Sequence, residues 1–299
     1  MRSTLEMARR CELNHDSPPM RLWRKAKRLG IWDPESFDLA RDIEDWRGLS
    51  ELEKELLLHL SSLFLAGEEA VVRDLLPLIR VISEQGRLEE EMYLTSFLWE
   101  EAKHVEAFSR FLTEVARGDT GDLSRFHQPT YKALFDDELP RSLYRLENDA
   151  SPVALAEASV TYNMVIEGVM AETGYHAYHT VLAGHNLLPG MQQIVGHIKR
   201  DESRHLGYGV YLLSRLVAEH GDPVWDAIQQ RMDHLLGLSL GVINETFALY
   251  DVLPFGLAVE DYVQFASEQF QRRMQRITLA RGQTLDEVIC ATDFEQAET

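Results

Sequence analysis

The chain has 299 residues, of which 45% are hydrophobic and 26% charged, a composition typical of a globular protein with a sizeable core. Acidic residues outnumber basic ones 49 to 30, giving a formal net charge of −19, which argues against nucleic acid and anionic membranes as partners. No signal-type apolar core and no run of about 18 uncharged apolar residues occurs, so we expect a cytoplasmic protein that is not an integral membrane protein. Cys11 and Cys290 lie near opposite ends without metal-ligand spacing, as expected in a reducing compartment.

The first half of the chain is predicted to be helical, because its apolar residues repeat with the helical period. Residues 1–48 are expected to form an arm with short helices that packs on the body. Ser50, followed three positions later by Glu53, predicts a capping box at the start of a helix over 50–86. Pro77 is expected to kink or interrupt that helix.

The same period continues to the end of the chain. Further helices are predicted over 87–117, 152–184, 189–220, 223–250 and 259–281. Residues 119–150 are expected to be a polar, irregular connection between two helical hairpins, and the tail from Gly282 a loose end. The predicted fold class is all-α: a single domain over 1–299, with a four-helix bundle core at about 50–220 and additional packing helices at about 223–281.

Six residues repeat one pattern along the four bundle helices: a lone Glu, then Glu-x-x-His, then the same again. They are Glu68, Glu101, His104, Glu167, Glu202 and His205. The spacing from Glu68 to Glu101 is 33 residues and that from Glu167 to Glu202 is 35, each about the length of one long helix plus a turn. A four-helix bundle with this order can place four carboxylates and two imidazoles around a pair of metal ions in its core.

The arrangement is more specific than the tetrad, because Glu-x-x-His arises easily by chance. A third copy, Glu12-x-x-His15, lies in a polar stretch without helical pattern and is interpreted as a chance match. Glu68 is expected on the apolar face of its helix, where an ionised carboxylate is costly unless it binds a cation. Glu69 and Glu100 are instead expected on wetter, more polar surfaces. The alternative is that the acids are solvated on exposed faces and the histidines are ordinary core or surface residues.

Carboxylates mixed with imidazoles suit iron and manganese, and one nitrogen per metal leaves positions open for O2 or a substrate. Each histidine also needs an acceptor for its second ring nitrogen. Asp201, next to Glu202, is the candidate for this second-shell role, and the alternative is a surface acid.

With these residues in place, residues 50–280 resemble the small subunit of class I ribonucleotide reductase and, more closely, its ligand-binding oxidase relatives. Two positions depart from the typical reductase subunit. Glu68 stands where that subunit has Asp, and Phe108 stands where it has its radical tyrosine. A reductase subfamily with phenylalanine at the second position exists, so Phe108 alone does not decide between the two.

The resemblance implies a ferritin-like fold, an O2-activating enzyme and a heterodinuclear manganese–iron site, with di-iron as the alternative. It implies a bound long-chain fatty acid or similar lipid. The leading interpretation is a two-electron oxidase that acts on this ligand, and a homodimer is expected. The resemblance also implies an ether cross-link between a valine and a tyrosine near the metals, for which Val71 and Tyr162 stand at the matching positions. The competing readings are a ribonucleoside-diphosphate reductase small subunit, a ferritin-like storage protein and a helical scaffold without metal.

Overall fold

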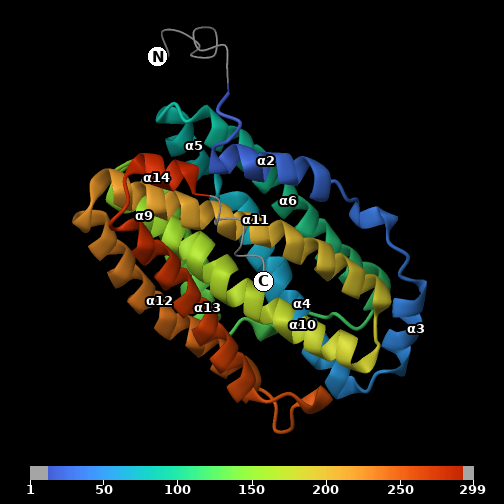
Figure 1. Cartoon of the computed structure of the whole chain (residues 1–299). Helices are drawn as coiled ribbons and strands as arrows, with labels where there is room; N and C mark the ends of the chain where they lie inside the picture. Colours follow the sequence, from blue (N-terminus) through green and yellow to red (C-terminus); the bar gives the residue numbers. More distant parts are fainter. Residues whose placement is uncertain (1–12, 292–299) are drawn as a thin grey trace.

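The structure, a computed structural model, describes residues 13–291, and every regular element in that range is a helix (Figure 1). The predicted all-α fold is therefore confirmed. Within the same range, no helix combines the length and the apolar character needed to cross a membrane. Cys11 and Glu12 lie outside the described residues, and Cys290 is an exposed free thiol.

Four long helical runs form the bundle. They are α4 (Glu51–Asp74), α6 (Leu88–Arg110), the continuous run of α9 (Pro152–Ser159), η6 (Val160–Ala171) and α10 (Glu172–His185), and α11 (Pro189–His220). The predicted capping box is present, since Ser50 accepts from the backbone N–H of Glu53 and the Glu53 carboxylate accepts from that of Ser50. The predicted interruption is also present, because α5 (Leu76–Glu84) starts as a new helix with Pro77 in its first turn.

Additional helices cover the bundle on two sides. α12 (Asp222–Ala248) and α13 (Val259–Ala280) pack against η6 and against each other. α2 (Pro18–Leu29) lies across α6 and α11, and α3 (Ala40–Gly48) packs at the far end of α11 (Figure 1). Among the shorter elements are the 3₁₀ turns η1 (Pro34–Ser36) and η7 (Pro254–Gly256) and the π-helical segment η2 (Phe111–Val115), which continues α6.

The expectation of a loose tail from Gly282 is wrong for its described part. Thr284 and Glu287 form a second capping box, which starts the short helix α14 (Leu285–Cys290). This helix packs on α11 and buries Val288 completely. The capping signal was present in the sequence, but the segment is too short to show a helical period.

The expectation of a polar, irregular connection over 119–150 is also wrong. The segment contains η3 (Leu123–Phe126), α7 (Pro129–Lys132), η4 (Ala133–Glu138), α8 (Leu139–Tyr144) and η5 (Arg145–Glu147). Its apolar side chains are buried, including Tyr131, Leu134, Leu139 and Leu143. These residues recur every three to five positions and face the core, while most of the charged residues between them are exposed. Glu138 is the exception, since it is buried and pairs with Arg231 from α12.

The middle of the third bundle run is a π-helix, η6, in which backbone bonds link residue i to i+5. This changes which residues share a face. Tyr162 and Glu167 are five positions apart, so in a π-helix they lie nearly one above the other and both point into the bundle core. In an ordinary α-helix, two side chains five positions apart point about 140° away from each other around the helix axis. No residue pattern in the sequence indicates the π-helix.

Candidate metal centre

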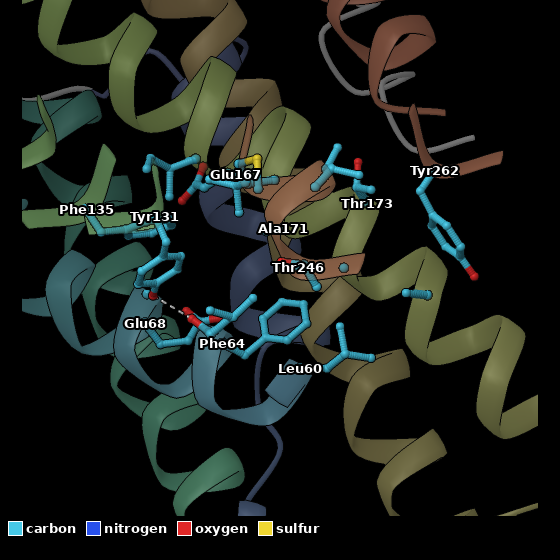
Figure 2. Close-up of a pocket in the computed structure, with 18 of the residues that line it drawn as sticks. Leu60, Phe64, Glu68, Tyr131, Phe135, Glu167, Ala171, Thr173, Thr246 and Tyr262 are labelled. Carbon is cyan, nitrogen blue, oxygen red and sulfur yellow. Dashed lines mark hydrogen bonds between the residues drawn. The ribbon is translucent and has the colours of Figure 1, made fainter. Parts of the chain in front are cut away.

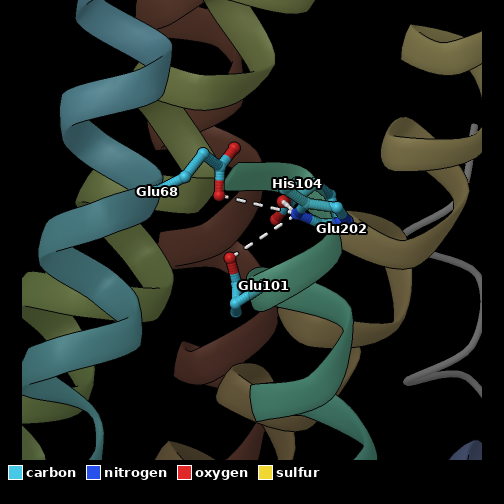
Figure 3. Close-up of side chains that lie close together, drawn as sticks. All are labelled: Glu68, Glu101, His104 and Glu202. Carbon is cyan, nitrogen blue, oxygen red and sulfur yellow. Dashed lines mark ion pairs between the residues drawn. The ribbon is translucent and has the colours of Figure 1, made fainter. Parts of the chain in front are cut away.

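The six predicted residues converge in the bundle core. Glu68 comes from α4, Glu101 and His104 from α6, Glu167 from η6, and Glu202 from α11. His205 follows one turn after Glu202, and all six side chains are buried. Four of them, Glu68, Glu101, His104 and Glu202, are seen to point at one another in Figure 3.

The six side chains divide into two ligand groups that share two members. Glu68 and His104 form one group with Glu101 and Glu202, and Glu167 and His205 form the other group with the same two glutamates. In each group, one ligand atom from every residue lies within 4.8 Å of the others. Glu101 and Glu202 are thus placed to bridge two ions, and the other four residues to bind one ion each.

Each histidine presents Nδ1 to the carboxylates. His104 Nδ1 lies 3.5 Å from oxygens of both Glu68 and Glu101 and 3.3 Å from Glu202 Oε1. His205 Nδ1 lies 2.9 Å from Glu101 Oε1 and 3.4 Å from Glu202 Oε2. These spacings leave room for an ion between nitrogen and oxygen, because a metal–ligand distance of about 2 Å on each side spans them.

The opposite ring nitrogens point at a different pair of acids. His104 Nε2 lies 3.4 Å from Asp201 Oδ2, and His205 Nε2 lies 2.9 Å from Glu100 Oε2. An acceptor at Nε2 fixes the tautomer in which Nδ1 carries a free lone pair, as a metal ligand requires. The second-shell role of Asp201 stays a prediction that this geometry supports.

The expectation that Glu100 lies on a wetter surface is wrong, because its side chain is fully buried. Its neighbours at helical spacing are Ser96 and Lys103, which are polar in the sequence but also buried in the structure. Arg204 explains this burial, since its guanidinium donates to Glu100 at 2.6 Å and also pairs with Asp201. Sequence reasoning missed Glu100 and Arg204, although both lie directly beside motif residues.

The residues present fit a pair of metal ions. Four atoms of the ligand set are buried without a hydrogen-bond partner, namely His104 Nδ1, Glu167 Oε1, Glu202 Oε2 and His205 Nδ1. Burial raises the pKa of Glu68 to about 8 and that of Glu167 well above its usual range. Four carboxylates so close together, with unsatisfied atoms all aimed at one space, form a donor set that cations would stabilise.

Hydroxyl and amide groups surround the carboxylates. Tyr162 donates to Glu101 Oε1 at 3.0 Å, and Tyr175 donates to Glu68 Oε1 at 3.1 Å. Asn163 donates to Glu167 Oε2 at 3.3 Å. Burial holds the pKa of both tyrosines well above the usual value, so both phenols keep their protons near neutral pH.

Phe108 occupies a fully apolar position. Its ring stacks on Phe64 with centroids 4.9 Å apart and is fully buried. On the other side of the centre, Phe97 stacks on the His205 ring at 3.6 Å. The chain therefore has no phenol at the position of the reductase radical tyrosine, and Tyr162 and Tyr175 are the phenols in contact with the carboxylates.

An apolar pocket leads to the four glutamates from between α4, η6, α12 and α13 (Figure 2). About 940 Å³ of it is free of protein atoms, part of this open to solvent. Its lining includes Leu60, Phe64, Val71, Tyr131, Phe135, Met170, Ala171, Val242, Thr246 and Tyr262. No Lys, Arg or His among residues 13–291 lines it, so from this part of the chain no side chain offers a positive charge to an anionic ligand at its inner end, and bound metal ions would supply that charge.

We expect the metal-free protein to lose unfolding free energy as the pH rises from about 5 to 8. The folded chain keeps the Glu68 proton up to about pH 8, whereas the unfolded chain releases it near the usual value of 4.5. His104 and His205, whose pKa values are raised by the carboxylates, act in the same direction. Glu101 and Asp201 have lowered pKa values and are ionised in both states in this window.

Each proton that only the folded chain retains lowers the unfolding free energy by about 1.4 kcal/mol per pH unit. Urea denaturation of the metal-free protein at pH 5.5 and 7.5 measures the effect. Greater stability at the higher pH contradicts the prediction.

Comparison with known proteins agrees with this architecture. The family model described as "Ribonucleotide reductase, small chain" matches residues 15–280. An R2-like ligand-binding oxidase from Sulfolobus acidocaldarius is 36% identical, with a TM-score of 0.87 over 96% of this chain and 99% of that chain. A structure of an R2-like ligand-binding oxidase with aerobically reconstituted Mn/Fe cofactor is 33% identical, with a TM-score of 0.87 over 92% of this chain and 98% of that chain.

These matches cover nearly the whole chain, and the range of the family model spans the positions of both ligand groups. The predicted resemblance is therefore confirmed. The chain belongs to the ribonucleotide reductase small-chain family and is, within it, an oxidoreductase of the R2-like ligand-binding oxidase type with a di-metal site.

Proposed function

We propose that this chain binds one manganese and one iron ion in its two ligand groups and uses them with O2 for the two-electron oxidation of a long-chain fatty acid or similar lipid. The observation that carries the proposal is an apolar pocket that ends on four buried glutamates. The relative with a reconstituted Mn/Fe cofactor supports the choice of metals, and the ligand-binding oxidases support a bound ligand. When bound, two such ions supply the electrons that O2 activation consumes.

The protein's contribution is to fix the donors and exclude water. Glu101 and Glu202 are placed to bridge the ions, while Asp201 and Glu100 orient the two imidazoles. The Tyr175 hydroxyl donates a hydrogen bond to Glu68 and so helps to orient that carboxylate. Because the same oxygen and nitrogen donors also suit two iron ions, a di-iron form is the alternative that reconstitution with iron alone tests.

The pocket fits a ligand with an acidic head and an apolar chain. An acid's head group would reach the metal end, where the ions compensate its charge, and its chain would lie along the apolar side chains of the lining. Placing a charged head in this pocket without metals would leave it unpaired, because the described residues that line the wall include no basic one. Ligand and metal binding are therefore expected to depend on each other.

We also propose the ether cross-link between Val71 and Tyr162. Val71 lines the pocket one turn after Glu68, and the Tyr162 hydroxyl donates to Glu101. Both side chains belong to the same buried apolar cluster. Forming the bond removes the hydrogen from Val71 Cβ and the hydrogen from the Tyr162 hydroxyl, and joins carbon to oxygen. The two hydrogens leave as two electrons and two protons, which O2 would accept. The two metal ions, when bound, would supply the two further electrons, and solvent the two further protons, that complete the reduction of O2 to water.

Replacing Ala171 by Phe is expected to prevent lipid binding without removing the metals. Ala171 lines the pocket, and a benzyl group there would fill the path of the chain. We expect the amount of fatty acid recovered by solvent extraction and mass spectrometry to fall at least about tenfold. A tenfold loss of affinity corresponds to about 1.4 kcal/mol of binding free energy. Ala183→Phe, on the exposed end of α10, is the matched control. Equal lipid recovery from both variants at full metal content argues against this pocket as the lipid site.

The second candidate function is the small subunit of a ribonucleoside-diphosphate reductase, favoured by the family match over residues 15–280. With Phe108 in an apolar stack, such a subunit would have to store its oxidising equivalent on the metals. Specific retention of the chain by an immobilised large reductase subunit supports this second function. The homodimeric state and the cytoplasmic location stay predictions.

A further inference from the structure

We propose that one face of α2, together with Trp99, docks an acidic one-electron carrier protein that reduces the metal centre. We call it the basic–apolar face. It consists of Arg24, Lys27, Arg28, Leu29, Ile31, Trp99 and Arg200. The proposal rests on the proposed function, because it names the redox partner of the same centre.

The charge of this face is opposite to that of the chain as a whole. α2 carries five basic residues and no acidic one, in a chain with a net charge of −19. Arg24, Lys27 and Arg28 stand at i, i+3 and i+4 and are all exposed, so they share one side of the helix. Arg200, exposed on the neighbouring α11, adds a further positive charge. The positive region ends at Asp33, beyond the end of α2.

Large apolar side chains are exposed beside these charges. Leu29 is 45% exposed, Ile31 71% and Trp99 48%. They are neighbours in space, because Lys103 Nζ lies 4.3 Å from the Trp99 ring centre and donates to Gly30 O at 2.6 Å. Aromatic and aliphatic anchors ringed by charge are typical of protein interfaces, and electron-transfer partners use weak, transient interfaces of this kind.

The face lies directly over a chain of contacts to the metal centre. Lys103 sits between the Trp99 and Trp32 rings, 4.2 Å from the latter. Trp32 Nε1 donates to Asp201 Oδ2 at 2.7 Å, and the same oxygen lies 3.4 Å from His104 Nε2. The exposed indole is thus linked to a metal-ligand histidine through consecutive close contacts.

Close packing of α2 keeps this path short. Gly30 fits between α6 and α11 only because it has no side chain, since a Cβ there would lie 2.0 Å from Glu100 Oε1. In each encounter the carrier is oxidised by one electron and the metal centre is reduced by one, with no bond formed or broken. Two encounters supply the two electrons that restore the reduced centre.

The binding test uses an acidic [2Fe–2S] ferredoxin as the probe, titrated against the full-length chain by calorimetry at low and at high salt. The test variant is Arg24→Glu/Lys27→Glu/Arg28→Glu, which changes only exposed side chains. The matched control is Arg73→Glu/Arg141→Glu/Arg281→Glu, which makes the same charge change at exposed arginines on other elements. We expect the test variant to bind at least about tenfold more weakly than the wild type, the control to stay within about twofold, and high salt to weaken wild-type binding.

Four results overturn the proposal. The first is equal weakening by both variants, and the second is no binding by the wild type at low salt. The third is a change of oligomeric state in the test variant alone, which assigns the face to a second copy of the chain. The fourth is binding to anionic lipid vesicles but not to the ferredoxin.

A kinetic experiment distinguishes failure of this proposal from failure of the proposed function on which it rests. Metal content is measured first, so that a preparation lacking two metals per chain tests the proposed function and leaves the binding result intact. In loaded protein, Trp32→Phe is expected to bind ferredoxin with unchanged affinity and to slow its oxidation, followed by the absorbance of the iron–sulfur cluster. Unchanged oxidation in Trp32→Phe contradicts the path from this face to the centre.

Discussion

Glu101→Ala is expected to remove both metal ions from the protein, whereas Glu68→Ala is expected to leave one. Glu101 belongs to both ligand groups, and Glu68 to only one. Removing a shared carboxylate takes a donor from each ion and leaves the remaining buried acids to repel one another. Elemental analysis after reconstitution should give about two metals per chain for the wild type, about one for Glu68→Ala and close to none for Glu101→Ala.

Two further variants make this series specific. Glu202, also shared by both groups, should behave like Glu101 when replaced by alanine. Glu69→Ala is the matched control, because the Glu69 side chain, next to Glu68 in the sequence, is 49% exposed and pairs with Arg73. The shared role of the two glutamates is wrong if Glu68→Ala and Glu101→Ala lose the same number of ions.

Exposure of the manganese- and iron-loaded protein to O2 is expected to join Val71 to Tyr162. Trypsin would release these residues in peptides 55–73 and 146–199, so the product is a single species lighter than the sum of the two by two hydrogens. The expected effect is large because the bond is covalent and survives denaturation. The physical basis is that the Tyr162 hydroxyl contacts Glu101, while Val71 faces the pocket beside Glu68.

Tyr162→Phe is the control for this reaction, since it removes only the phenolic oxygen. It should eliminate the joined peptide and retain about two metals, because Tyr162 lies outside both ligand groups. Metal-free protein treated with O2 should also give separate peptides. Finding the two peptides separate in fully loaded, oxidised wild-type protein would defeat the cross-link proposal.

The helical framework could be predicted because its signals are local. The Ser50 capping box, the break at Pro77 and the helical period of the apolar residues all act within a few residues of where they appear. The connection 119–150 was missed because its buried side chains recur irregularly among charged residues. Its Tyr131 and Phe135 form one wall of the pocket, so this error concerned the site as well as the fold.

The ligand pattern could be read from sequence because its spacing is tied to helix geometry. The surrounding network could not, since it depends on contacts between distant segments. Glu100 has polar neighbours on its own helix and is buried only because Arg204 and His205 from α11 meet it. The position of Tyr162 depends on a π-helix, which no local pattern indicates.

The central claim, a heterodinuclear centre between two ligand groups that share two glutamates, is tested most directly by anomalous diffraction. Crystals of protein reconstituted with manganese and iron in air would be measured at the absorption edges of both metals. The account predicts two peaks, one beside Glu68 and His104 and the other beside Glu167 and His205, with one position rich in manganese and the other in iron. A single peak, peaks outside these side chains, or zinc alone in the site would contradict it.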